Sequence, residues 1–207
     1  MPLERRATVI DSFSNAPEQI KEVVNKYDKS LKNVGYTNDE DGSYYSGEDG
    51  IMMKEEISDD EYGETFRHEY GHYIDNKLGV LSKNASDDFL FQQTYQIEKE
   101  HLYDNLGSLL NDLQMNNNVL ESNYISDILS ALSENDFDIK CFYLENTCGF
   151  FSHDDEYWEG RENAGRSETF ANLFAIYAEN NSDVVAFTEK WFPELSRQFK
   201  NSIEEMI

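Results

Sequence analysis

Long apolar runs are absent from this sequence of 207 residues, and so is any excess of positive charge. No stretch approaches the ~20 apolar residues that a membrane-spanning helix needs. No apolar segment follows Arg5 and Arg6, so no signal peptide is visible. The 17 basic residues face 42 acidic ones, which gives a formal net charge of -25. Because such a surface repels phosphate backbones and anionic lipid, we expect no nucleic acid and no membrane among the direct partners.

Cysteine and proline are equally scarce. The two cysteines, Cys141 and Cys148, cannot build a disulfide framework, and their spacing matches no usual zinc-binding pair. We expect two plain thiols in a reducing compartment, and a disulfide across a tight hairpin is the alternative. With three prolines and 39% apolar residues, the chain can bury a core as a single domain over residues 1–207, with a helical insert at about 85–132.

The spacing of apolar residues predicts a helix-rich α+β protein. Helical periodicity recurs in the segments 17–31, 85–114, 119–132, 167–179 and 183–206, the last of them interrupted at Pro193. Strand character is found in two short segments, 50–54 and 141–144. A loop rich in glycine and charge, residues 152–166, precedes the helix at 167–179.

A further helix is signalled at both of its ends. Ser58 and Glu61 form a capping box, and the acids between them suit the positive end of the helix dipole. Gly79 can close the far end in a left-handed conformation. We therefore predict a helix over residues 58–79.

An H-E-x-x-H pattern lies inside this helix, as His68-Glu69-Tyr70-Gly71-His72. Composition alone gives roughly 0.01 chance matches to the pattern in such a chain. Histidines four residues apart share one helix face, one turn apart, so both can bind one zinc ion. Glu69 lies on the flank of that face, where it can act as general base on a water whose pKa zinc lowers to ~7.

A helical wheel separates this helix into two faces. One face, about 120° wide, is apolar and aromatic, and it contains Tyr62, Phe66, Tyr70, Tyr73 and Ile74. The other face carries both histidines and Asp75. The pattern predicts one face in the core and one facing a polar site. The competing interpretation is a pair of satisfied histidines without metal.

A catalytic zinc usually takes a third protein ligand and leaves one position to water. The glycine and the histidine that the metzincin pattern requires after His72 are replaced by Asp75 and Leu78, which excludes that pattern. We predict Glu168 as the third ligand, because it opens an apolar helix after a loop that can fold back over the histidines. The alternatives are His153 and, after it, Asp154, Asp155 or Glu162.

Other residues are candidates for supporting roles. Asn172 and Asp75 could each orient a ligand histidine by a hydrogen bond to its second ring nitrogen, or could be solvated polar residues. Tyr157 and His153 precede the predicted third ligand, where a donor could stabilise a tetrahedral oxyanion. Tyr157 could instead be a hydrophobic anchor. Together with Glu69, these two residues complete the predicted catalytic set.

Two further features of the sequence are better interpreted as ordinary surface segments than as functional sites. His101 lies in a polar run, where a solvated side chain is the ordinary expectation. The segment from Thr37 to Glu48 falls on the calcium-loop template except at its first position, and the residues after it have extended character. We expect no calcium there.

Several blocks of the sequence match a known group in the same order: 44–46, 50–53, 66–75, 126–132, His153 with Tyr157-Trp158, and 168–172. Together they resemble the zincin-like domains found with phage minor head (Mu F-like head morphogenesis) proteins. A looser likeness is to gluzincin-type toxin peptidases of the anthrax lethal factor kind. The resemblance covers roughly residues 44–177.

The resemblance implies a zincin-like α+β fold, with a small, twisted, mainly antiparallel sheet packed on the active-site helix and a helical C-terminus. It implies Glu168 as the third zinc ligand. It also implies that 50–54 is an edge strand over the active-site helix, able to pair with an extended peptide. It suggests the cytoplasm of a bacterial host or the virion as the location, with phage structural proteins as partners.

Three functions follow from these observations. The first is a zinc-dependent endopeptidase that hydrolyses a protein or peptide substrate, with Zn²⁺ as its cofactor. The second is a phage head-associated or interaction domain in which zinc is only structural. The third is an acidic binding protein that mimics DNA and carries the motif incidentally.

Overall fold

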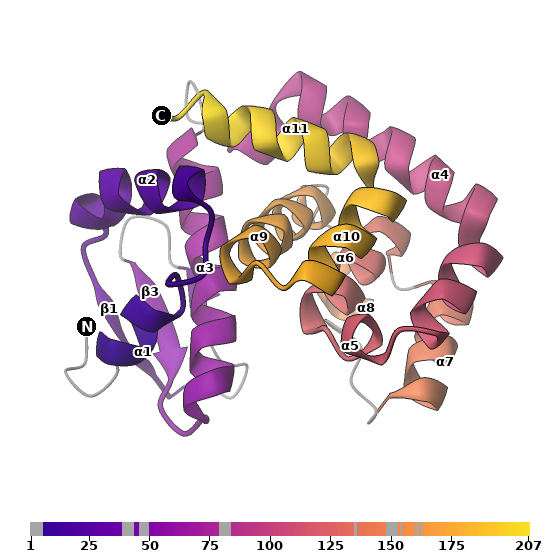
Figure 1. The fold of residues 1–207 in the computed structure, drawn as a ribbon, viewed down its shortest axis with the longest axis horizontal. Helices are drawn as coiled ribbons and strands as arrows, with labels where there is room; N and C mark the ends of the chain where they lie inside the picture. The colour runs from indigo at the N-terminus through magenta and orange to yellow at the C-terminus, as the bar shows by residue number, and fades with distance from the viewer. Residues whose placement is uncertain are drawn as a thin grey trace.

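Helices wrap around one central helix in this protein (Figure 1). The computed structural model describes residues 6–38, 44–45, 50–78, 84–134, 136–147, 153, 155–159, 161 and 163–207. The central helix is α9 (Ala164–Glu179). The others are α1 (Arg6–Asp11), α2 (Glu18–Tyr27), α3 (Asp59–Leu78), α4 (Phe89–Gln114), α5 (Asn117–Leu120), α6 (Asn123–Ser133), α7 (Phe137–Asn146), α8 (Asp155–Trp158), α10 (Ser182–Trp191) and α11 (Pro193–Glu204).

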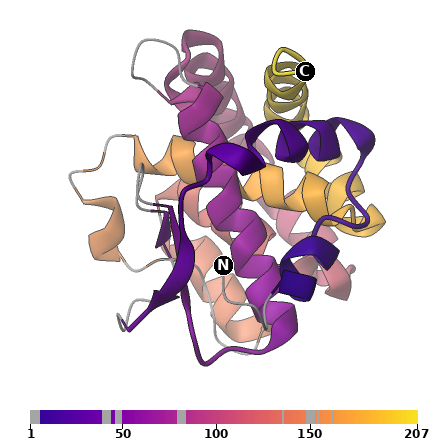
Figure 2. The same ribbon diagram turned by 90° about the vertical axis from the view of Figure 1, so that its left-hand side faces the viewer.

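A small sheet lies on one side of α3 (Figure 2). Its strands are β1 (Val34–Thr37), β2 (Tyr44–Tyr45) and β3 (Ile51–Lys54), in the order β1-β3-β2. β1 runs parallel to β3 over four residues, whereas β2 pairs with β3 in antiparallel fashion over two. Ile51 and Met53 are fully buried where β3 packs on α3, as the alternation of a half-buried strand requires.

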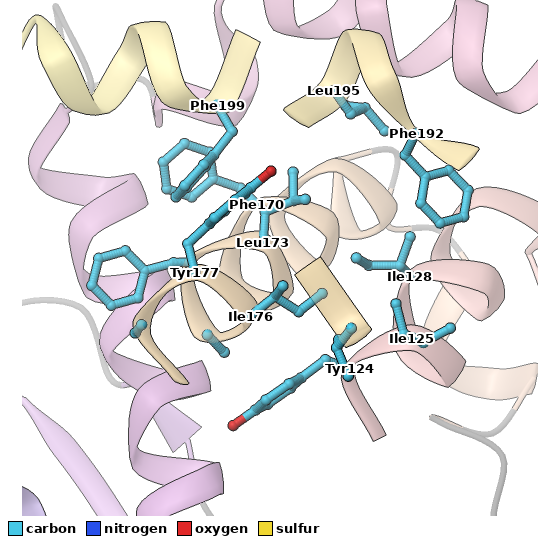
Figure 3. Close-up of a cluster of buried hydrophobic side chains, with 14 of the residues drawn as sticks. Tyr124, Ile125, Ile128, Phe170, Leu173, Ile176, Tyr177, Phe192, Leu195 and Phe199 are labelled. Carbon is cyan, nitrogen blue, oxygen red and sulfur yellow. The ribbon is translucent and has the colours of Figure 1, made fainter. Parts of the chain in front are cut away.

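The apolar core is centred on α9. Every residue from 168 to 178 is buried, because α3 and α6 pack on α9 and α4, α10 and α11 also contact it. Figure 3 shows Phe170, Leu173, Ile176 and Tyr177 of α9 among side chains from these neighbours. Tyr177 stacks on Phe199 at 5.4 Å between ring centroids. A helix that is buried on every side cannot show a clean amphipathic stripe, and this accounts for its near-continuous apolar sequence.

The predicted fold class is wrong. The described residues are mostly helical, and the longer strand pairing is parallel, so the small, mainly antiparallel sheet of an α+β zincin-like fold is not formed. The expected strand at 141–144 belongs to α7, because Ile139 and Tyr143 are buried four residues apart, which is helical spacing. β3 is the central strand rather than an edge, so the expected pairing of 50–54 with a substrate peptide at a free edge is also wrong.

Other local predictions are confirmed. The Ser58 side chain accepts a hydrogen bond from the backbone N–H of Glu61 at 3.2 Å, which is one of the two hydrogen bonds of the predicted capping box. Pro193 separates α10 from α11, and a prolyl first residue suits a helix start. Cys141 is a free thiol.

Gly79, Cys148 and most of the calcium-loop segment lie outside the described residues. Among the helices described, none has both the length and the apolar character needed to cross a membrane.

The contact between α3 and α9 is unusually close at Gly71. A Cβ atom at this position would lie 2.6 Å from the carbonyl oxygen and 2.7 Å from the Cα atom of Ala171. Both of those atoms belong to helix backbone, so they cannot move aside as a flexible side chain could. Glycine at position 71 therefore sets the separation of the two helices.

Replacing Gly71 with alanine should lower the free energy of unfolding by about 1–3 kcal/mol, because the added methyl group overpacks a helix–helix contact. Gly107→Ala is the matched control. Gly107 also lies inside a helix, but a Cβ there would meet nothing within 4 Å. The control should therefore gain about 0.5–1 kcal/mol from helix propensity. Denaturant unfolding in the presence of a chelator measures both variants, and equal gains would contradict the close contact.

Candidate metal centre

Three potential metal ligands meet where α3 and α9 cross. His68 and His72 lie one turn apart on α3, and Glu168 faces them from α9. The three side chains are almost enclosed, with exposed fractions of 14%, 16% and 4%. Of the residues that the structure describes, these form the cluster of histidine, cysteine and acidic groups that could hold a metal ion.

The distances between the donor atoms suit tetrahedral zinc. The two histidine Nε2 atoms are 3.1 Å apart, His68 Nε2 is 3.2 Å from Glu168 Oε2, and His72 Nε2 is 3.4 Å from Glu168 Oε1. Zinc–nitrogen and zinc–oxygen bonds of 2.0–2.2 Å place neighbouring tetrahedral ligands about 3.3 Å apart. The donor set and its spacing therefore fit a zinc ion that has three protein ligands.

The Glu168 carboxylate also requires a positive charge beside it. Its Oε2 atom is buried and accepts no hydrogen bond of good geometry from a described residue. Burial by itself raises the pKa of Glu168, but positive charge on His72, with contacts from His153 and His68, holds it well below its usual range. An ionised carboxylate in this setting is stable only next to a cation. A metal ion at the cluster would meet that requirement.

The charge of Glu168 also changes the pKa values of His68 and His72. Burial lowers the pKa of His68, but the Glu168 carboxylate outweighs it and raises the value to about 10. The same two opposing effects raise the pKa of His72. A negative potential that holds protons on buried imidazoles also attracts a metal cation, so zinc and protons compete for these nitrogens.

The second ring nitrogen of His68 is anchored by Asn172. Nδ1 lies 3.1 Å from the amide oxygen of Asn172, and the amide nitrogen donates to the main-chain oxygen of Glu168 at 2.9 Å. The second bond fixes the orientation of the amide, so its oxygen must accept a hydrogen bond from Nδ1–H. Nε2 of His68 then carries the lone pair that a metal needs.

A longer chain of hydrogen bonds anchors His72. Its Nδ1 lies 3.2 Å from Ser167 Oγ, which donates to Asp75 Oδ2 at 3.0 Å. Asp75 is fully buried and also accepts from the backbone N–H and the hydroxyl of Ser86, at 2.7 and 2.8 Å. Burial raises the pKa of Asp75 to about 6, although these hydrogen bonds lower it. Because Ser167 donates to Asp75, it accepts from Nδ1–H of His72 and leaves Nε2 free for metal.

Glu69 is buried beside the cluster, with 6% of its surface exposed. Its negative charge contributes to raising the pKa values of His68, His72 and Tyr157. The carboxylate thus acts electrostatically on the ligand histidines and on Tyr157 from the flank that the helical wheel predicted.

Tyr157 and His153 contact the carboxylate of Glu168. The Tyr157 hydroxyl donates to Oε1, and His153 Nε2 lies 3.5 Å from Oε2. The two rings stack, with centroids 3.8 Å apart. Burial, reinforced by the charge of Glu168, raises the pKa of Tyr157, so the hydroxyl keeps its proton and remains a donor. The structure therefore places both residues around the predicted third ligand, and His153 is not one of the three clustered donors.

One premise of the prediction that Glu168 is the third zinc ligand is wrong. The sequence indicated that Glu168 opens its helix after a loop, but α9 begins at Ala164 and places Glu168 in its second turn. The loop interpretation of 152–166 failed at Gly165, which is helical because it packs against Tyr95 and the carbonyl oxygen of Ala131, where a Cβ would not fit. The same loop also contains the short helix α8.

Among the described residues, His101 does not join the cluster. His101 lies on α4, with Nδ1 3.3 Å from Glu98 Oε2 and a side chain 39% exposed. Asp154, Glu162 and the side chain of Asp155 lie outside the described residues.

Sequence reasoning missed Ser167, Ser86 and the spacing role of Gly71. No local pattern marks the two serines, because they act only through partners that are distant in sequence. Gly71 carried a faint signal, since a glycine in the middle of a helix costs about 1 kcal/mol and needs a packing or functional reason.

Changing Glu168 to alanine should weaken zinc binding by more than the ~10–100-fold that supporting residues typically contribute, because it removes a direct ligand. Glu156→Ala is the control, since Glu156 is an exposed acid on nearby α8. A competition titration with a chromophoric chelator compares the two variants directly. Wild-type affinity in Glu168→Ala would remove this residue from the site and make His153 the next candidate.

Ser167→Ala should weaken zinc binding by roughly 10–100-fold, because His72 loses the hydrogen bond that fixes its ring. Thr169→Ala is the matched control on the same helix. Within the described part of the chain, the Thr169 hydroxyl bonds to α9 itself, at the carbonyl oxygen of Gly165, over 2.7 Å. Isothermal titration with zinc measures both variants, and equal losses would mean that general loosening of α9, rather than the chain through Asp75, is responsible.

Comparisons with known proteins add no relative. No protein-family model matches the chain, and no curated protein or solved structure matches it either. The resemblance to phage head-associated zincin-like domains therefore stays a prediction, and the case for a metal centre rests on the geometry described above.

Proposed function

We propose that this protein is a zinc-dependent hydrolase of peptide bonds, with His68, His72 and Glu168 as the zinc ligands. The observation that carries the proposal is the convergence of three donor atoms from two helices at spacings that suit zinc. Three protein ligands leave a fourth position open, which is typical of catalytic rather than structural zinc. When bound, zinc would act as a Lewis acid and make water nucleophilic near neutral pH.

Glu69 is the proposed general base. It lies next to a ligand histidine in sequence, is shielded from solvent, and its charge reaches the same groups that surround the cluster. A carboxylate in this position can take a proton from the attacking water and deliver it to the leaving amine. The chemistry requires one base on the flank of the His pair, and helical spacing supports Glu69 as that base.

Tyr157 and His153 are assigned to positioning in this proposal. The Tyr157 hydroxyl orients Glu168 by donating to one carboxylate oxygen, and His153 approaches the other oxygen. Tyr157 keeps its proton because its pKa is raised, so it could also stabilise an oxyanion if it turned from Glu168 to substrate.

A structural role for zinc is the second candidate, and the low exposure of the three ligands favours it. Closed structural sites usually have four protein ligands, and the described cluster supplies three. Under either reading, the resemblance to phage head-associated domains makes phage structural proteins the first partners and substrates to test.

Glu69→Gln should retain zinc and the fold but lose hydrolysis by ~10²–10⁴-fold, because glutamine preserves the shape of the side chain without its basicity. Glu61→Gln, at an exposed acid in the first turn of the same helix, is the control and should keep wild-type activity. Elemental analysis and a peptide-library digest would be run on each protein. Wild-type cleavage by Glu69→Gln would defeat the proposal, and zinc without any cleavage by the wild type would favour the structural role.

A further inference from the structure

A hollow is lined by residues of α4, α8 and the first turn of α9, together with Glu134 after α6 and Arg161 between α8 and α9. Its volume is about 430 Å³. Of the described residues that line it, Lys99, Arg161 and Arg166 are basic and Glu134 is acidic. In a chain with 17 basic residues and a net charge of -25, cations therefore outnumber anions among the described residues that line this hollow.

Partners compensate two of these three cations. Lys99 forms an ion pair with Glu134 at 2.6 Å, and Arg166 pairs with Asp87 at 3.3 Å. Arg161 forms no ion pair with a described carboxylate, and its guanidinium lies over the ring of Tyr157, 4.6 Å from the centroid. The hollow therefore has the charge to receive one anionic group, and Arg161 is the residue that would meet it.

The helices α8 and α9 each contribute residues both to the hollow and to the surroundings of the metal centre. Trp158 lines it, and the neighbouring Tyr157 donates to Glu168. Gly165 also lines it, three residues before Glu168 on α9, which is about 4.5 Å along a helix axis. Figure 2 shows α8 to one side of the beginning of α9, on the side of the molecule that carries the sheet. Since an extended peptide advances ~3.3 Å per residue, a substrate at the cluster could place a nearby side chain here.

We propose that this hollow is a substrate subsite for one carboxylate, within a few residues of the bond that is cleaved. The inference rests on the proposed peptide hydrolysis and specifies its substrate class. Guanidinium groups bind carboxylates through two parallel N–H donors, which favours arginine over other cations for this task. The contact of the Arg161 guanidinium with the Tyr157 ring limits the rotation of this side chain, which lowers the cost of holding it in place for a ligand.

The carboxylate can come from an aspartate or glutamate side chain or from the C-terminus of the peptide. Three otherwise identical peptides distinguish these sources. The first has a glutamate and an amidated C-terminus, the second has glutamine in its place, and the third has glutamine with a free C-terminal carboxylate.

The decisive quantity is the ratio of kcat/KM between an acidic peptide and the neutral one. Wild-type protein should favour one of the two acidic peptides by roughly tenfold or more, as a hydrogen-bonded charge typically does. In Arg161→Gln this ratio should fall towards one, whatever the variant does to absolute rates. Arg197→Gln is the control, because Arg197 is an exposed arginine on α11 that pairs with Glu194. A wild-type ratio near one, or an unchanged ratio in Arg161→Gln, would overturn the proposal.

A binding measurement separates this inference from the proposed function. The tryptophan emission, to which Trp158 in the hollow and Trp191 on α10 contribute, should change when an acidic peptide binds to the zinc-loaded wild-type protein or to its Glu69→Gln variant. If no peptide is cleaved but one of the two acidic peptides binds roughly tenfold more tightly than the neutral one, the subsite stands and the hydrolase assignment fails. If peptides are cleaved but all three bind equally, the hydrolase assignment stands and the subsite fails.

Discussion

The close packing of α3 against α9 is the constraint on which the site depends. Gly71 lets the backbones approach until a methyl group would touch Ala171, and this approach brings Glu168 to the His68–His72 pair. Side chains of fixed length cannot bridge a wider gap, so a shift of even one methyl group would separate the donor atoms. The densely packed core cannot accommodate such a shift, because protein interiors are packed as densely as organic crystals.

Burying this cluster would be costly without compensation. A carboxylate and two imidazoles lie against a core of aromatic and aliphatic side chains, where an unpaired charge is strongly disfavoured. Hydrogen bonds to the Nδ1 atoms of both rings offset part of this cost. Asn172 bonds to His68, and Ser167, which also donates to Asp75, bonds to His72. Both anchors leave the Nε2 atoms facing Glu168, so the inner side of the cluster is arranged for a cation.

Charge is distributed unevenly over the molecule. A net charge of -25 favours solubility and repels polyanions at long range, but its effect is screened within about 10 Å at ordinary ionic strength. Contacts therefore decide local chemistry: Asp87 compensates Arg166 in the hollow, whereas Arg161 pairs with no described carboxylate, although the protein is acidic as a whole. Composition predicts which classes of partner the whole surface repels, whereas it says little about the charge of a single subsite.

The sequence by itself determined the H-E-x-x-H helix, its capped start and its two faces, because these follow from the 3.6-residue period and from local capping chemistry. It also pointed to Glu168, although through a wrong helix start. Only the tertiary structure decided the mostly helical architecture, the central position of β3, and the chain from His72 through Ser167 to Asp75. These features arise from contacts between residues far apart in the sequence, such as Asp75 and Ser167, which are separated by 92 in residue number. Local periodicity carries no information about such contacts.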